Sequence, residues 1–212
     1  MVNAMFDRIA MALARATSLS NRKADEAAER VICALACEQL QRLADQDGGL
    51  LPGERLIVIN ESPYAAGNRR DGRADLKIVQ RFNCSERTTW VEVKPLFRGL
   101  LYFNPAKFYS NPVQDPQYTT RSIVLDDIDK LKLRPPKGDG RAFAIVMNVD
   151  QMKQKPDQTP TRDGVRITPG QIFWLIQKRF MHTFDANPQY GSGCYGNTAA
   201  LVMGLPPADG SR

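Results

Sequence analysis

The clearest periodic signal in the chain is an apolar stripe at helical spacing over residues 22–44. Carboxylates at Asp25, Glu26 and Glu29 occupy its first turns, where negative charge suits the helix dipole. The pattern therefore predicts a long helix with one face in the core. The stripe consists of Ala28, Val31, Ile32, Leu35, Ala36, Gln39, Leu40 and Leu43.

Three other segments have a helical pattern. A short helix is expected over residues 3–16 and another over 121–133. A third begins at Thr168, because Thr168 can cap a helix and Pro169 suits the first helical position.

Between these helices the apolar period changes to that of β-strands. The strand segments are rich in β-branched residues and are bounded by glycine, proline and polar turns. Proline at position 95 ends one of them. The predicted strands are 55–61, 73–80, 88–95, 141–149 and 198–204.

The resulting order, α-β-β-β-α-β-α-β after the short first helix, predicts an α/β protein with a mixed sheet covered by helices. We divide the chain into a helical N-terminal arm at 1–21, one domain at 22–205 and a flexible tail at 206–212. A chain of 212 residues can form one sizeable core.

Composition restricts the function classes. Hydrophobic residues make up 42% of the chain and charged residues 25%, which is ordinary for a globular protein and excludes a disordered or membrane-spanning chain. A single histidine, His182, and the absence of a CxxC pair argue against a zinc centre. The net charge of +6 favours a polyanionic partner such as nucleic acid. No secretory signal is evident, so we expect a cytoplasmic protein with no membrane partner.

Two neighbouring predicted strands carry charged residues among their apolar ones. In the third strand Trp90, Glu92 and Lys94 share one face, because side chains alternate across a sheet. In the second strand Asp75 shares a face with Lys77 and Val79. The opposite faces are predicted to carry Val91 and Val93 in the third strand and Ala74, Leu76 and Ile78 in the second.

If these strands form a hairpin, Asp75 and Glu92 meet at one end of the sheet. Two carboxylates can hold Mg²⁺ through oxygen ligands, and Lys94 projects beside them. Such a lysine could position or deprotonate a water and neutralise a phosphate. Phosphodiester hydrolysis needs this set of groups.

Asp75, followed seventeen residues later by Glu92-Val93-Lys94, resembles the motif of the PD-(D/E)XK nuclease superfamily, although Ala74 stands where the family name has proline. The resemblance implies a restriction-endonuclease-like fold and Mg²⁺-dependent cleavage of DNA, less often RNA, with Mn²⁺ as a substitute. It implies that Asp75 and Glu92 bind the metal, that Lys94 is catalytic, and that Glu29 is the acid contributed by the preceding helix.

Other charged residues extend the candidate site. Glu61, at the end of the first strand, is an alternative to Glu29 as the third acid. Arg69, Arg70 and Arg73 precede Asp75 and are candidates for binding nucleic-acid phosphates.

We therefore expect a metal-dependent endonuclease, with DNA as its partner, acting in restriction, mobile-element processing, repair or as a DNA-targeting toxin. A homodimer or larger assembly is compatible with the sequence. The alternative is a catalytically inactive nucleic-acid-binding or assembly subunit with the same fold.

Overall fold

The structure is a computed structural model that describes most of the chain. The described residues are 2–20, 29–47, 54–64, 72–82, 85–95, 102–103, 123–149, 165–166 and 169–208. They form four helices: α1 (Val2–Leu19), α2 (Glu29–Asp47), α4 (Ile123–Leu133) and α6 (Pro169–Phe184). The strands are β1 (Glu54–Pro63), β2 (Arg73–Phe82), β3 (Ser85–Pro95), β4 (Tyr102–Phe103), β5 (Gly140–Asn148), β6 (Val165–Arg166), β7 (Gln189–Tyr195) and β8 (Thr198–Leu205).

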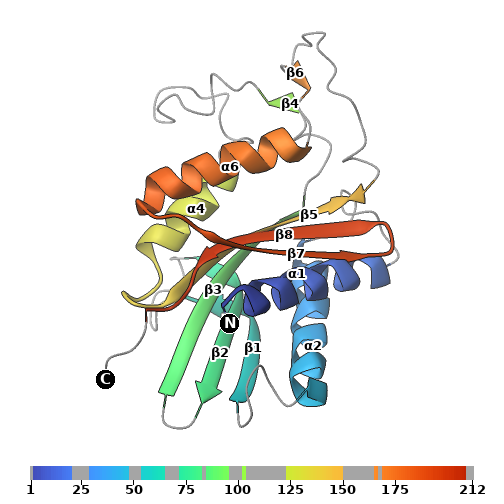
Figure 1. Ribbon diagram of the computed structural model, residues 1–212, viewed down its shortest axis with the longest axis vertical. Helices are drawn as coiled ribbons and strands as arrows, with labels where there is room; N and C mark the ends of the chain where they lie inside the picture. The colour runs from blue at the N-terminus through green and yellow to red at the C-terminus, as the bar shows by residue number, and fades with distance from the viewer. Residues whose placement is uncertain are drawn as a thin grey trace.

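Six of the strands form one mixed open sheet in the order β1-β2-β3-β5-β8-β7. Strands β1, β2 and β3 form an antiparallel meander, and β5 then lies parallel to β3. A parallel neighbour requires a crossover connection, and α4 lies within it. Strands β8 and β7 complete the sheet with antiparallel pairings, and the sheet twists strongly between its two edges (Figure 1). The predicted α/β class and mixed sheet are confirmed.

Helices cover both faces of this sheet (Figure 1). Helices α1 and α2 pack on the face that carries Leu76, Val91 and Val93, and together they form the larger core cluster. Helices α4 and α6 pack on the opposite face, where Trp90 and Phe143 are buried. The sheet is therefore the middle of three layers, and both of its central strands are inaccessible to solvent along most of their length.

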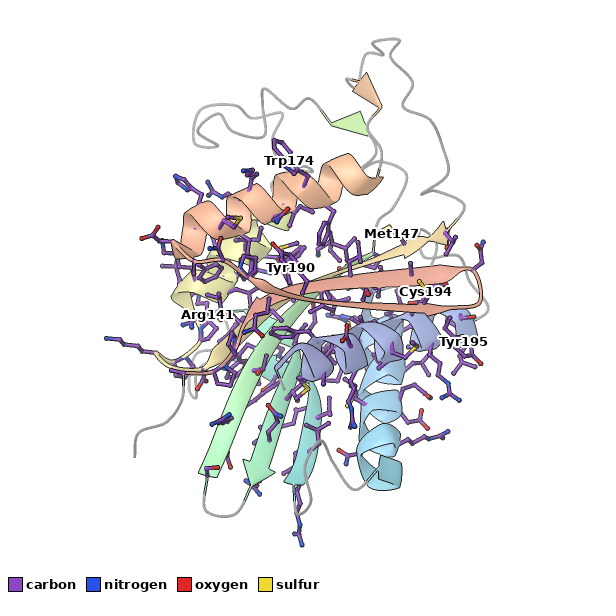
Figure 2. The ribbon with its side chains drawn as sticks, viewed as in Figure 1. Arg141, Met147, Trp174, Tyr190, Cys194 and Tyr195 are labelled. Carbon is purple, nitrogen blue, oxygen red and sulfur yellow. The ribbon has the colours of Figure 1, made fainter. Side chains whose placement is uncertain are left out.

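Helix α1 approaches the edge strand β7 unusually closely. A Cβ atom at Gly191 would overlap the backbone of Phe6, and one at Gly193 would overlap the backbone of Met11. At the hairpin turn, Tyr195 lies beside the end of α1, with its ring centroid 5.6 Å from the Arg15 guanidinium carbon (Figure 2). The helix predicted as an N-terminal arm thus packs within the main core.

The elements differ from the predicted ones in a few places. Strand β7 was not predicted, because its sequence QYGSGCY lacks the β-branched residues that mark a strand. Val31, predicted in the apolar stripe of α2, is exposed, whereas Ile32 and Leu40 are buried. No helix in the described part of the chain is long and apolar enough to cross a membrane.

Candidate active site

Glu92 and Lys94 lie near the end of β3, on the face covered by α4. Lys77 pairs with Trp90 and Leu76 pairs with Val91, which is the last pair of the β2–β3 ladder. Trp90 faces α4 and α6, while Val91 and Val93 face α1 and α2, as the alternation predicts. Beyond the last pair the two strands separate, and the charged side chains occupy this end of the sheet.

Asp75 lies where β2 leaves β3. Its Oδ2 accepts a hydrogen bond from the backbone N–H of Val93 at 2.6 Å, so a side chain replaces the missing backbone partner. The alternation of β2 breaks here: Ala74, predicted on the face of Leu76, packs instead with the cluster under α4 and α6. In β1, Glu61 lies between the paired residues Asn60 and Ser62 and has a φ of 50°, so the neighbouring strand is also distorted at this level.

The electrostatic surroundings of Asp75 oppose its ionisation. Burial and then the charge of Glu29 raise the pKa of Asp75 to about 6, against the opposing effects of the Val93 N–H and Lys94. A carboxyl group with such a pKa is sensitive to any cation that enters the site.

Glu92 is the most strongly perturbed acid of the site. It is buried, and the Tyr64 hydroxyl donates a hydrogen bond to its Oε1. Burial, followed by the charges of Asp75 and Asp127, raises the pKa of Glu92 to about 9, although Lys130 and Tyr64 act in the other direction. Tyr64 is itself held against Trp90, with ring centroids 5.1 Å apart. The Glu92 carboxyl group is thus held in position by Tyr64, and negative charge exceeds positive charge around it.

Lys94 connects the two helical layers through a pair of carboxylates. Its Nζ lies 2.8 Å from Glu29 Oε2 on α2 and 2.9 Å from Asp127 Oδ2 on α4. Burial alone would lower the pKa of Lys94, but Asp127 and Glu29 outweigh it and raise the pKa. The ammonium group therefore stays charged between the two acids.

Helix α4 contributes a second lysine. Asp127, whose side chain is 3% exposed, also forms an ion pair with Lys130 one turn further along α4. The Lys130 side chain is 39% exposed, against 10% for Lys94. Burial alone would lower the pKa of Lys130. The charge of Glu92 and the contact with Asp127 outweigh this effect, so the pKa is raised.

The structure separates the sequence candidates into two groups. Asp75, Glu92, Lys94 and Glu29 come together at this end of the sheet. Glu61, the alternative third acid, pairs instead with Arg30 at 2.9 Å and with Arg73 at 3.6 Å. Arg73 is exposed near this end of β2, while Arg69 and Arg70 lie outside the described residues.

Three residues of the site were not predicted from the sequence: Tyr64, Asp127 and Lys130. For Asp127 a signal existed, since it follows Ile123 by four residues and precedes Leu131 by four, and thus falls on the apolar face of its helix. A buried aspartate at that position needs a cationic partner. Tyr64 follows β1 in a turn-like segment, which gave no comparable signal.

The donor set suits a hard divalent cation bound by few protein ligands. Asp75 and Glu92 offer carboxylate oxygens, and the negative charge of Asp75 raises the pKa of Glu92, so positive charge is in deficit there. Within the described residues, no three histidine, cysteine or acidic side chains form a ready metal cage. Mg²⁺ typically binds through one or two carboxylates and keeps several waters or takes substrate phosphates, so Asp75 and Glu92 fit that requirement.

Comparison of the chain with family models, curated proteins and solved structures gives no match. The functional argument therefore depends on the motif and on the geometry of this site.

Proposed function

We propose that the protein is a metal-dependent nuclease that hydrolyses phosphodiester bonds in nucleic acid, with DNA as the preferred substrate. The observation that carries the proposal is the convergence of three elements on one site. Asp75 from β2, Glu92 and Lys94 from β3, and Glu29 from α2 lie together where β2 and β3 separate. This is the placement that resemblance to the PD-(D/E)XK nucleases implies, and it supports a restriction-endonuclease-like fold.

Asp75 and Glu92 would hold the cation. When bound, Mg²⁺ or Mn²⁺ supplies Lewis-acid charge toward the phosphoryl group. The Val93 N–H orients the carboxylate of Asp75, and the Tyr64 hydroxyl orients that of Glu92. Both acids therefore keep their positions without relying on mobile side chains, which is the preorganisation that a catalytic site needs.

Lys94 acts as a fixed positive charge in this proposal. In the hydrolysis a water oxygen bonds to phosphorus, the bond to one bridging oxygen breaks, and the proton that the attacking water gives up to the solvent is balanced by the one that the departing oxygen takes up. Because Glu29 and Asp127 both bind the Lys94 ammonium group, Lys94 orients the attacking water and neutralises the phosphate instead of accepting a proton. Glu29 in turn positions Lys94 from the first turn of α2.

Incubation with supercoiled, linear and single-stranded substrates, with and without Mg²⁺ or Mn²⁺, tests the proposal. Wild-type protein should cut one or more of them only when a divalent cation is present. Glu92→Gln should lose detectable cleavage, because the amide keeps the shape but not the charge of the ligand. Lys94→Gln should lose about 10²–10³-fold in rate, the usual effect of removing one charge-stabilising group.

Glu86→Gln is the matched control, because Glu86 lies on the same strand but is exposed and paired with Arg81. Its cleavage rate should equal that of wild type, which also excludes a contaminating nuclease as the source of the activity. Thermal melting of each variant separates loss of activity from loss of folding. Cleavage by Glu92→Gln at the wild-type rate, or no cleavage of any substrate by wild type, would overturn the proposal.

A further inference from the structure

The two lysines of the site differ in how far a ligand can reach their ammonium groups. Lys94 is 10% exposed and its ammonium group is engaged by carboxylates from both helical layers. Lys130 is 39% exposed, and its ion pair with Asp127 is its only ion pair among the described residues. Of the two, Lys130 is thus the one whose ammonium group is more open to a molecule arriving from solvent.

Lys130 is also tied electrostatically to Glu92, one of the two candidate metal-binding acids. Its charge acts on Glu92, and Glu92 acts on Lys130 in return. Asp127 fixes the position of both lysines, since one of its oxygens contacts Lys94 and the other contacts Lys130. The side chain of Lys130 is therefore anchored near Glu92 while part of it stays in contact with water.

We infer that Lys130 of α4 contacts a phosphate of the nucleic-acid substrate, and that Asp127 is a positioning residue that aligns Lys130 with Lys94. The inference rests on the proposed nuclease function, to which it adds a binding residue that the D…ExK motif does not include. A partly exposed ammonium group is a suitable partner for a phosphate diester, and each such contact releases counterions when substrate binds. The crossover helix would then bind the substrate while the β2–β3 end carries out the cleavage.

The salt dependence of DNA binding tests this role. Binding of a fluorescent duplex is measured by anisotropy between 50 and 200 mM salt, with Ca²⁺ in place of Mg²⁺ to hold the duplex uncut. Lys130→Gln should reduce the slope of log affinity against log salt by about 0.9, or by about 0.7 for a single strand. Lys130→Arg should keep the wild-type slope, because it retains the charge.

Lys132→Gln is the matched control, because Lys132 lies in the same last turn of α4 but is exposed and is not one of the two lysines that pair with Asp127. Its slope should equal that of wild type. A purely structural role of Lys130 would lower the melting temperature of Lys130→Gln and leave the slope unchanged, and that result would overturn the inference alone. If wild-type protein binds neither duplex nor single strand, the proposed function itself falls.

Discussion

The molecule attaches its helices to the sheet in two contrasting ways. At one edge the backbone of α1 lies directly against β7 at Gly191 and Gly193, while the apolar side chains of α1 are buried in the larger core cluster. At the β2–β3 end, α2 and α4 meet the sheet through charges, with the buried Lys94 between Glu29 and the buried Asp127. The first junction is close backbone packing, supplemented by a hydrogen bond from the Ser192 N–H to Asp7 Oδ1 at 2.9 Å, whereas the second is an ion-pair network.

The two junctions have different energetic consequences. Apolar burial at α1 stabilises the fold directly. Removing charges from water at the second junction costs free energy that their mutual attraction only partly offsets, and well-packed apolar residues of similar volume often do as well or better. A charged junction of this kind is what the proposed nuclease function would require.

The largest expected effect is the loss of the central charge of the network. Lys94→Ala should lower the free energy of unfolding by about 3–5 kcal/mol, because it leaves Asp127 buried and deprived of one of its two cations. Adding Asp127→Asn to this variant should restore part of the loss. Urea unfolding measures both variants. Arg81→Ala, which removes an exposed ion pair with Glu86, should cost less than about 1 kcal/mol. Equal effects of Lys94→Ala and Arg81→Ala would contradict the description of the site as desolvated.

The α1–β7 junction should respond mainly to side-chain volume at its glycines. Gly191→Ala should cost about 1–3 kcal/mol or more, since the added methyl group overlaps the Phe6 backbone, which cannot move aside as a side chain can. Ser192→Ala, the neighbouring exposed position on β7, should be nearly neutral. Urea unfolding again provides the comparison. A neutral Gly191→Ala would show that α1 lies further from β7 than described.

The metal-free protein should lose stability as the pH rises through neutrality. An unfolded Glu92 releases its proton near its ordinary pKa of 4.5, whereas the folded pKa is about 9. Between these values the unfolded state holds fewer protons, so unfolding becomes easier with increasing pH, by at most about 1.4 kcal/mol per pH unit.

The window from pH 6 to 9 isolates Glu92 from Asp75, whose folded pKa is about 6. Thermal unfolding in chelator, repeated for Glu92→Gln, measures this dependence, and the variant should show a flatter profile. Equal profiles for the two proteins would mean that Glu92 ionises freely in the fold.

The β2–β3 half of the site was predictable from sequence because it lies on regular strands. Alternation along β3 placed Glu92 and Lys94 on one face, and the hairpin brought Asp75 to the same end. The prediction wrongly extended strict alternation to Ala74, because nothing in the sequence marks the point at which β2 leaves β3. That departure depends on the Asp75 carboxylate accepting the Val93 N–H, which is a tertiary contact.

The α4 half of the site was missed for a different reason. A helix containing Asp126, Asp127, Asp129 and Lys130 resembles an ordinary solvated helix, and charge alone does not say which acid is buried. Only the position of Asp127 on the apolar face distinguished it. Strand β7 was missed because the same glycines that admit α1 remove the usual strand signal.

Calorimetric titration with Mn²⁺ tests the central claim most directly, that Asp75 and Glu92 form a divalent-cation site. Wild type and the control Glu86→Gln should bind the ion with the same affinity. Asp75→Asn and Glu92→Gln should each weaken binding by more than roughly tenfold, since each removes a ligand charge. Unchanged Mn²⁺ binding by Glu92→Gln, with the variant folded, would contradict the account.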